Sequence, residues 1–183
     1  MEIRIREPVP SDASALGRLH AEAWHVAYDG HMPAELLAGI TVERRTAMWE
    51  RITASPRPER QRIAIADLGG TAVGFAWTGP CRDEDSPQGA GELYAINVHP
   101  GSWRSGVGTA LLEAAHTALA TEGFPTAVLW VLPTNDRARR FYERHDWFAD
   151  GAARDEESNG FIVPEVRYTR RFQSLIKAED GRG

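Results

Sequence analysis

The sequence predicts a single domain of the mixed α/β class. Segments that alternate like strands and segments with helical spacing follow one another from residue 3 to residue 172. No internal repeat and no stretch rich in Pro, Gly or Ser marks a boundary between two domains. A chain of 183 residues can bury one sizeable core. We therefore expect one domain over residues 1–172, followed at 173–183 by a flexible tail that ends in EDGRG.

The first part of the chain is expected to form one strand and two helices. Residues 3–7, IRIRE, alternate apolar and charged side chains, as a half-buried strand does. Apolar residues recur at helical spacing over 16–27, after Ser11 or Asp12, either of which can cap this helix. The segment DGHMP interrupts the pattern. A second helix is expected over 42–53, and the prolines of SPRPER end it.

The rest of the chain supplies most of the strands and two further helices. RIAIAD and TAVGFAWTG flank the turn LGG and predict a hairpin. ELYAINV is another strand, and a helix follows it. TAVLWVL is almost entirely apolar, which is typical of a strand buried on both faces. NDRARRFYERHDW returns to helical spacing, and FIVPEVRYTRRF is the last strand. The expected order is strand, two helices, hairpin, strand–helix–strand–helix and a terminal strand.

Composition excludes several classes of function. The formal net charge of −5 argues against nucleic acid as a partner, because phosphates require a basic face. No run of about 18 apolar residues is present, and residues 1–14 lack the apolar centre of a secretory signal, so neither a membrane nor secretion is expected. A single cysteine, Cys81, cannot form an internal disulfide, and we expect a cytoplasmic protein. No cluster of His, Cys, Asp or Glu has metal-ligand spacing, so no metal is expected.

Two glycines stand where a helix is expected to begin. Gly106 and Gly108 belong to RSGVGT, which follows the strand ELYAINV. A helix N-terminus exposes unpaired amides at the positive end of the helix dipole, and glycine allows an anion to approach them. The stretch could bind a phosphate, or it could be a turn that needs glycine only for its backbone angles. It lacks the lysine of a nucleotide P-loop. Leu111 stands where the dinucleotide fingerprint needs a small residue, so a nucleotide-dependent oxidoreductase is disfavoured.

Two segments together resemble the GNAT superfamily of acyl-CoA-dependent N-acetyltransferases. ELYAINVHPGSWRSGVGTALL contains the family's Gln/Arg-x-x-Gly-x-Gly/Ala loop at residues 103–108, with Trp in the first position. LWVLPTNDRARRFYERHDW contains the Asn-x-x-Ala-x-x-Phe/Leu-Tyr signature, from Asn135 to Tyr142. Asp-Trp replaces the Gly-Phe that often follows. The resemblance spans about residues 3–172.

The resemblance implies a single-domain fold whose mostly antiparallel central sheet has two splayed strands and is flanked by helices. The pantetheine arm of acetyl-CoA is expected between these strands, beside the backbone of Ile96 and Val98, which could also be plain core residues. Asn135 could cap its helix and also contact the cosubstrate. The pyrophosphate is expected to bind the amides of six consecutive residues: Arg104, Ser105, Gly106, Val107, Gly108 and Thr109.

The resemblance also implies the chemistry of acetyl transfer. Tyr142 is expected to donate a proton to the departing thiolate, because a phenol with a pKa of about 10 stays protonated at neutral pH. Spacing alone is equally consistent with a core tyrosine. Glu92 heads a strand and is expected to accept the ammonium proton, directly or through water, although it could be only an exposed charge. His25 or His31 could serve instead.

These features predict an acetyl-CoA-dependent N-acetyltransferase that acetylates a primary amine of a small molecule or peptide by direct attack. Trp24 and Tyr28 lie in the region that shapes the acceptor pocket in the family, and we expect them to bind the substrate, although Trp24 also suits the core. The alternative is a non-catalytic acyl-CoA-binding or regulatory module of the same fold. Family members often form homodimers, so a homodimer is a possible assembly. The sequence does not specify the acceptor amine.

Overall fold

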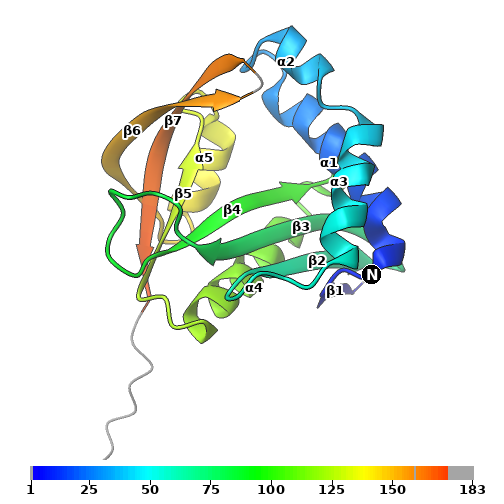
Figure 1. Cartoon of the computed structure of the whole chain (residues 1–183), viewed down its shortest axis with the longest axis horizontal. Helices are drawn as coiled ribbons and strands as arrows, with labels where there is room; N and C mark the ends of the chain where they lie inside the picture. The colour runs from blue at the N-terminus through cyan, green and yellow to red at the C-terminus, as the bar shows by residue number, and fades with distance from the viewer. Residues whose placement is uncertain (1, 159, 173–183) are drawn as a thin grey trace, which may run out of the picture.

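The computed structural model describes residues 2–158 and 160–172 and contains one seven-stranded sheet (Figure 1). The strand order is β1-β2-β3-β4-β5-β7-β6. Every neighbouring pair is antiparallel except β4 and β5. The strands are β1 (Ile3–Arg6), β2 (Arg62–Leu68), β3 (Thr71–Pro80), β4 (Gly91–Val98), β5 (Thr126–Val131), β6 (Phe148–Ser158) and β7 (Phe161–Arg171).

Helices cover both faces of the sheet. On one face lie α1 (Ala13–Tyr28) and α3 (Val42–Ala54), joined by the short α2 (Ala34–Ala38). On the other face lie α4 (Val107–Thr121) and α5 (Asp136–Glu143). Short 3-10 turns precede α1 and α4, at Pro10–Asp12 and Pro100–Ser102. None of the helices in the described part of the chain has the length and apolarity needed to cross a bilayer.

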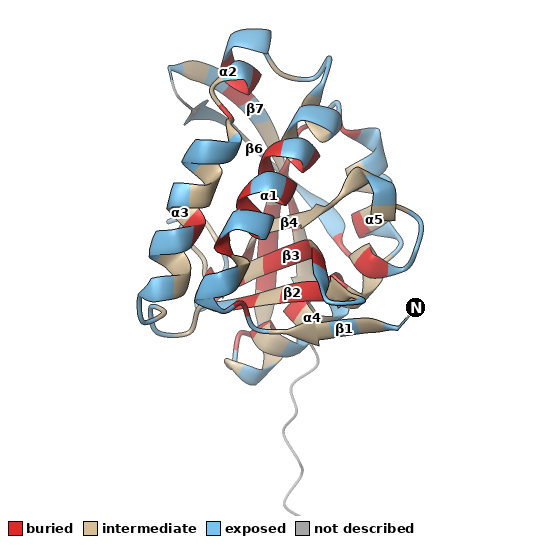
Figure 2. Cartoon of the chain, turned by 90° about the vertical axis from the view of Figure 1, so that its right-hand side faces the viewer, coloured by how far each residue is buried: buried red, intermediate tan, exposed pale blue. Residues whose placement is uncertain are grey.

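The alternation of side chains along the hairpin strands explains the two layers. On β2, Ile63 and Ile65 point toward the helices α1 and α3, whereas Ala64 and Ala66 point toward α4. Large residues therefore fill the space under two helices, and small ones allow α4 to pack close to the strands. Figure 2 shows the resulting buried stripe across β2 and β3 behind α1.

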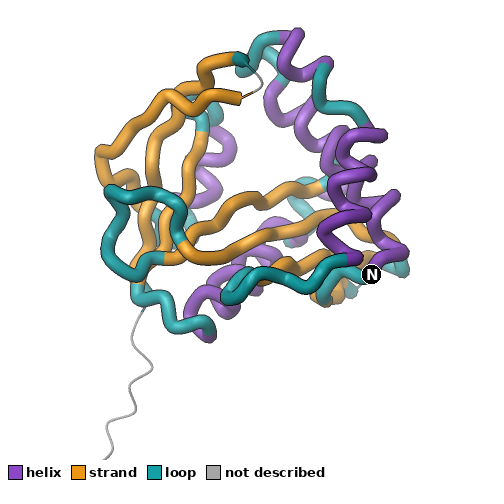
Figure 3. Tube along the Cα trace, viewed as in Figure 1, coloured by secondary structure: helices purple, strands orange, loops and turns teal. Residues whose placement is uncertain are grey.

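The parallel pair β4 and β5 is joined for only two residues. Gly91 pairs with Ala127 and Glu92 with Val128, and beyond this point the strands diverge. Figure 3 shows the antiparallel strands β1–β4 lying roughly along one axis, whereas β5, β6 and β7 turn away from that axis. A bulge contributes to the divergence, because Leu93 and Ala95 pair with consecutive residues of β3 and leave Tyr94 unpaired. Past Glu92, no strand in the described part of the chain pairs with the edge of β4 that faces β5.

The predicted fold class is confirmed, and two elements were missing from the predicted order. The helix α2 has only five residues, and the strand β6 carries mostly exposed residues along the edge of the sheet. Asp12 is the N-cap residue of α1, as one of the two predictions had it, but its side chain does not cap the helix, because the carboxylate accepts from the Val9 amide (2.8 Å) and pairs with Arg6 instead. The expected tail, 173–183, lies outside the described residues.

Candidate active site

A cleft of about 1010 Å³ opens where β4 and β5 diverge. Its walls come from α1 and α3 on one side and from α5 and the N-terminus of α4 on the other. A small apolar cluster packs α2 against the beginning of β7, and Figure 1 shows these two elements close together at the top of the molecule, above the divergence of β4 and β5. The cleft is thus bordered by elements from both ends of the chain.

The loop before α4 and the first turn of the helix carry amides with no acceptor within the described part of the chain. Gly106 is the N-cap of α4 in the left-handed conformation, with φ of 88°, and Arg104 is also left-handed, with φ of 62°. No acceptor for the amides of residues 104–109 is found among the described residues. Backbone that alternates in hand and ends at a helix N-terminus forms a concave binding site for anions. We call residues 104–109 the anion-binding loop.

The two glycines of this loop are required for different reasons. Gly106 is needed for its left-handed backbone. Gly108 has no such requirement, and a Cβ built on it would lie 3.5 Å from Phe141 Cζ, an ordinary contact. Glycine inside a helix costs about 1 kcal/mol relative to alanine. Neither packing nor backbone angle explains Gly108, which lines the cleft, and this favours a binding loop over a simple turn.

Four arginines surround the same end of the cleft: Arg104, Arg137, Arg140 and Arg144. The only ion pair among them in the described chain is a long one, 3.9 Å between Arg140 and Asp136. By contrast Arg139, on the same helix, donates to the Tyr168 hydroxyl (3.1 Å) and the Pro133 carbonyl (2.9 Å). Arg139 is therefore occupied within the fold, and the other four provide positive charge beside the anion-binding loop.

Trp103, which departs from the family signature, connects the two walls of the cleft. Its indole Nε1 donates to the Val98 carbonyl of β4 (2.9 Å). The guanidinium of Arg137, on α5, lies 3.6 Å from the centre of its ring. The indole thus contacts the strand on one side and the opposite helix on the other.

The helix α5 places Asn135 and Tyr142 at the cleft. Asn135 is buried and caps the helix, since its Oδ1 accepts from the Ala138 amide (3.1 Å). After the helix, Asp146 adopts φ of 61° where the family often has glycine, and Trp147 is fully buried. The departure from Gly-Phe therefore leaves the turn intact.

Tyr142 combines the features of a core residue and a cleft residue. Its side chain is 9% exposed and belongs to the main core, yet it lines the cleft. Burial raises the pKa of Tyr142 above its usual value of 10, and the nearby Tyr28 raises it further. Its hydroxyl forms no hydrogen bond with residues 2–158 and 160–172, and it is not among their fully buried unpartnered atoms. The phenol is therefore protonated at neutral pH and has a proton to donate.

Glu92 lies where β4 and β5 part, and its carboxylate is fully engaged. The residue is 2% exposed. Its Oε1 accepts from Arg82 Nη2 (2.5 Å), and its Oε2 accepts from the Arg82 amide and Nε (3.1 Å each). Glu92 does not line the cleft, whereas Arg82 does. It is thus not an exposed strand-end charge, and a proton could reach it from the cleft only through a relay.

A different carboxylate, Glu165 on β7, does line the cleft. Its Oε2 accepts from Arg154 Nε (2.9 Å), and burial raises its pKa above the usual value. On the opposite wall, burial raises the pKa of Tyr28 to about 12, and the charge of Glu165 contributes to this rise. Glu165 is not among the residues predicted from the sequence. The one signal in the sequence was a carboxylate within a mostly apolar strand. Its position at the cleft follows only from the pairing of β7 with β5, which the sequence does not specify.

The acceptor end of the cleft is aromatic. Trp24 and Tyr28, both predicted to bind the substrate, line it with ring centres 4.7 Å apart. His25 and His31 do not line it. His25 Nε2 donates to the Ile40 carbonyl (2.9 Å), and His31 lies 3.1 Å from the Thr134 hydroxyl.

A histidine absent from the predictions, His20, does line the cleft. Its Nδ1 has no partner among the described residues, and burial lowers its pKa to about 3. His20 is therefore neutral near pH 7.

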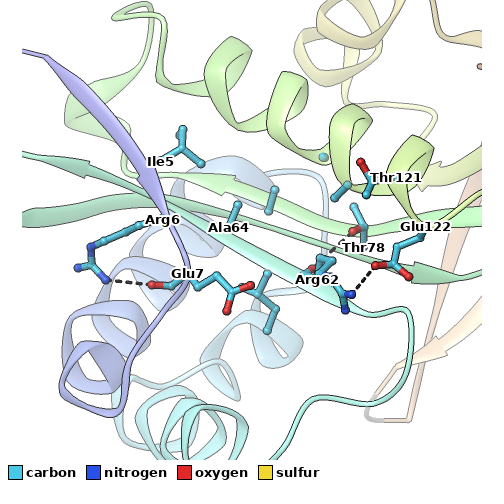
Figure 4. Close-up of a pocket in the computed structure, with 12 residues that line it drawn as sticks. Ile5, Arg6, Glu7, Arg62, Ala64, Thr78, Thr121 and Glu122 are labelled. Carbon is cyan, nitrogen blue, oxygen red and sulfur yellow. Dashed lines mark hydrogen bonds and ion pairs between the residues drawn. The ribbon is translucent and has the colours of Figure 1, made fainter. Parts of the chain in front are cut away.

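A second hollow, of about 280 Å³, lies between β1, β2 and α4 (Figure 4). Its polar rim is satisfied within the protein, since Arg62 pairs with Glu122 and Arg6 donates to the Glu7 carbonyl (3.2 Å). None of the predicted site residues lines it. The cleft between β4 and β5 is the stronger candidate for the active site.

Comparison with known proteins identifies the family. The model of the Acetyltransferase (GNAT) family matches residues 18–147. A probable N-acetyltransferase of Mycobacterium tuberculosis is 30% identical over 169 residues, which cover 91% of this chain and 92% of that protein. The chain belongs to the GNAT family of acetyltransferases. It is an N-acetyltransferase, and the resemblance inferred from its two motifs is confirmed.

Solved structures show the same fold as this acetyltransferase. The PaiA N-acetyltransferase of Thermoplasma acidophilum, in complex with coenzyme A, is 18% identical with a TM-score of 0.70, covering 94% of this chain and all of that one. YncA of Salmonella typhimurium, with acetyl-CoA, is 16% identical with a TM-score of 0.68, covering 99% and 100%. At these identities the likeness shows the fold alone.

The structure brings most of the predicted site residues of this acetyltransferase into one cleft. Ser105 and Val107 do not line it, because the Ser105 hydroxyl donates to the Ser102 carbonyl (2.6 Å) and the Val107 side chain is buried in the core. Glu92 is the third exception. The ten others that line the cleft are Trp24, Tyr28, Ile96, Val98, Arg104, Gly106, Gly108, Thr109, Asn135 and Tyr142.

Proposed function

We propose that this protein transfers the acetyl group of acetyl-CoA to a primary amine of a small molecule or peptide by direct attack. The observation that carries the proposal is the cleft itself, which places the anion-binding loop and the Tyr142 phenol along one opening between two unpaired strand edges. Family membership shows acetyl transfer in general, and the residues of the cleft support the finer assignment.

The residues at the α4 end suit coenzyme A. Amides of the anion-binding loop would bind the pyrophosphate, and the four surrounding arginines would add charge for the phosphates. The exposed edge of β4 at Ile96 and Val98 would pair with the amide groups of pantetheine, as an added strand does. When bound, the cosubstrate supplies a thioester carbonyl, and the residues of this chain would hold that carbonyl in place.

Tyr142 would act as the general acid. The acceptor nitrogen forms a bond to the carbonyl carbon while the carbon–sulfur bond breaks, and the electron pair of that bond goes to sulfur. Tyr142 would donate its hydroxyl proton to this sulfur. A buried phenol with a raised pKa stays protonated until the thiolate develops, so the proton is available at every working pH.

The acceptor nitrogen must lose its proton before it attacks, and two carboxylates are candidates for receiving it. Glu165 faces the cleft, and its raised pKa makes its carboxylate a better base near neutral pH than an exposed glutamate. Glu92, the residue expected from the sequence, would need a water to connect its buried carboxylate with the cleft. We assign the role of proton acceptor to Glu165. That Glu92 accepts this proton through a water stays a prediction.

The test is release of free thiol from acetyl-CoA by the purified protein over a panel of amines and peptides. We expect turnover with at least one acceptor class and coenzyme A binding measurable by calorimetry. Binding without thiol release for any acceptor would instead support the non-catalytic acyl-CoA-binding module. Absence of both would contradict the proposal.

A further inference from the structure

One charged group at the acceptor end of the cleft has no counter-charge within residues 2–158 and 160–172. Arg45, on α3, is half-buried and lines the cleft. Its Nη1 donates only to the Met48 sulfur, at 3.8 Å, and its guanidinium lies 5.2 Å from the centre of the Trp24 ring. No carboxylate in the described parts of the chain pairs with it, and burial lowers its pKa. A guanidinium removed from water without a partner is costly, so a fold keeps it only where something compensates.

The other arginines of the cleft do not share this situation. Arg82 forms a bidentate pair with Glu92. The four arginines near the anion-binding loop come from the loop itself and from α5, where the phosphates are proposed to bind. Residues of α3 and of α5 both line the cleft, and Figure 2 shows these two helices on opposite sides of the molecule with α1 between them. Arg45 is therefore separate from the phosphate end, and its charge needs another explanation.

The surroundings of Arg45 favour an anionic group on the acceptor. The nearby wall of the cleft is apolar or aromatic, from Trp24, Met48 and Trp77. His20 is neutral and offers no negative charge. In so apolar a site a carboxylate would accept two charge-assisted hydrogen bonds from the guanidinium fork, which water competes for only weakly.

We infer that the acceptor of this acetyltransferase is an amine that also carries a free carboxylate, and that Arg45 binds that carboxylate. The inference rests on the proposed function. Glu165, which lines the cleft from β7, has its Oε2 on Arg154, and its Oε1 would accept from the ammonium group. The aromatic and thioether side chains that line this end of the cleft would contact an apolar side chain of the acceptor. A free amino acid and the C-terminal residue of a short peptide are two sources of the same carboxylate.

The experiment compares matched acceptors. The probes are L-methionine, L-methioninamide and 3-(methylsulfanyl)propylamine, together with glycyl-methionine and its C-terminal amide. Each carboxylate, L-methionine or glycyl-methionine, is compared with the matching amide. For whichever of these two carboxylates is the better substrate, we expect a wild-type kcat/KM about 10- to 100-fold higher than for its amide. The arm with the larger ratio identifies the source, free amino acid or peptide terminus.

Variants of α3 test the role of Arg45. Arg45→Gln is expected to reduce the carboxylate-to-amide ratio to about one, and Arg45→Lys to keep part of it, while calorimetry with coenzyme A alone gives the wild-type affinity. The control is Arg51→Gln, which removes the same charge from an exposed position of α3 that does not line the cleft. It should keep the wild-type ratio. If Arg45→Gln fails to fold, Arg45→Lys and the wild-type ratios carry the test.

The outcomes separate this inference from the proposed function. Thiol release from acetyl-CoA with amides and carboxylates used equally well, in wild type and Arg45→Gln alike, would overturn the inference and leave the acetyltransferase assignment standing. A preference for carboxylates that survives in Arg45→Gln would also overturn the assignment of Arg45. If no amine of any class yields thiol, the proposed function fails, and the inference fails with it.

Discussion

The two glycines of the anion-binding loop yield the sharpest prediction, because substitutions at Gly108 separate folding stability from cosubstrate affinity. A Cβ at Gly108 meets Phe141 at 3.5 Å and Val98 at 3.9 Å, so no neighbour must move. Gly costs about 1 kcal/mol in a helix and Val up to about 0.7, so Gly108→Val should change the free energy of unfolding by less than about 0.5 kcal/mol. Gly108→Ala should raise it by up to about 1 kcal/mol.

The effect of Gly108→Val on coenzyme A is expected to be much larger. Its methyl groups would project toward the cleft at the helix N-terminus, where the pyrophosphate is proposed to contact the amides. Loss of one charge-assisted hydrogen bond costs about 1.5–3 kcal/mol, which corresponds to a Kd raised roughly 10- to 100-fold. Gly108→Ala is the milder change and should keep most of the affinity, since the family signature allows alanine there.

Calorimetric titration with coenzyme A measures the affinity, and urea unfolding without coenzyme A measures the stability. Gly106→Ala is the contrasting variant, because a φ of 88° is strained for any residue with a Cβ, and about 1–2 kcal/mol of stability should be lost. A Gly108→Val protein that unfolds like the wild type and binds coenzyme A equally well would refute the placement of the pyrophosphate on this loop.

Three further predictions concern the chemistry and the electrostatics of the cleft. Tyr142→Phe should lower kcat about 100-fold and leave coenzyme A affinity within twofold; unchanged turnover, with the chemical step shown to be rate-limiting, would reject the acid role. Because burial raises the pKa of Glu165, kcat/KM should fall as pH falls through that raised value, and Glu165→Gln should lose this acid limb while Glu92→Gln keeps it. Persistence of the limb in Glu165→Gln would point to another base. His20 has a folded pKa of about 3 against 6.5 unfolded, so its stabilising contribution is complete above pH 6.5 and is lost as the pH falls toward 3. Between pH 7 and pH 5 the loss is about 2 kcal/mol, and urea unfolding of His20→Gln should show a correspondingly smaller loss.

Local sequence patterns sufficed for the elements whose structure is decided locally. The helix α4 begins at Val107, directly after the glycine where the change to helical spacing predicts it, and the hairpin turns at Gly69 and Gly70, both with positive φ. Asn135 caps α5 as its position in the motif predicts. In each case the deciding interaction lies within a few residues along the chain.

Elements decided by distant contacts were missed. The strand β6 reads FADGAARDEES, a polar segment with little β-propensity, and it forms a strand because it pairs with β7 along most of its length. The helix α2 forms around Leu36, which packs against β7 residue Val163. Glu165 and Arg45 reach the cleft only because β7 lies beside β5 and α3 packs on α1. No pattern within these segments specifies those neighbours.

The pair of Glu92 and Arg82 shows why a residue at the expected position can have a different role. β4 and β5 separate directly after Glu92, so the sheet is weakest at this point. Arg82 binds both oxygens of Glu92, and its guanidinium lies 4.4 Å from the centre of the ring of Tyr94, the bulged residue. The Tyr94 hydroxyl donates to the Pro80 carbonyl (2.6 Å), which connects the bulge to the end of β3. These contacts stabilise the divergence that creates the cleft, so a carboxylate engaged in them contributes to the geometry of the site, whereas Glu165, with one oxygen on Arg154, is better placed to exchange a proton.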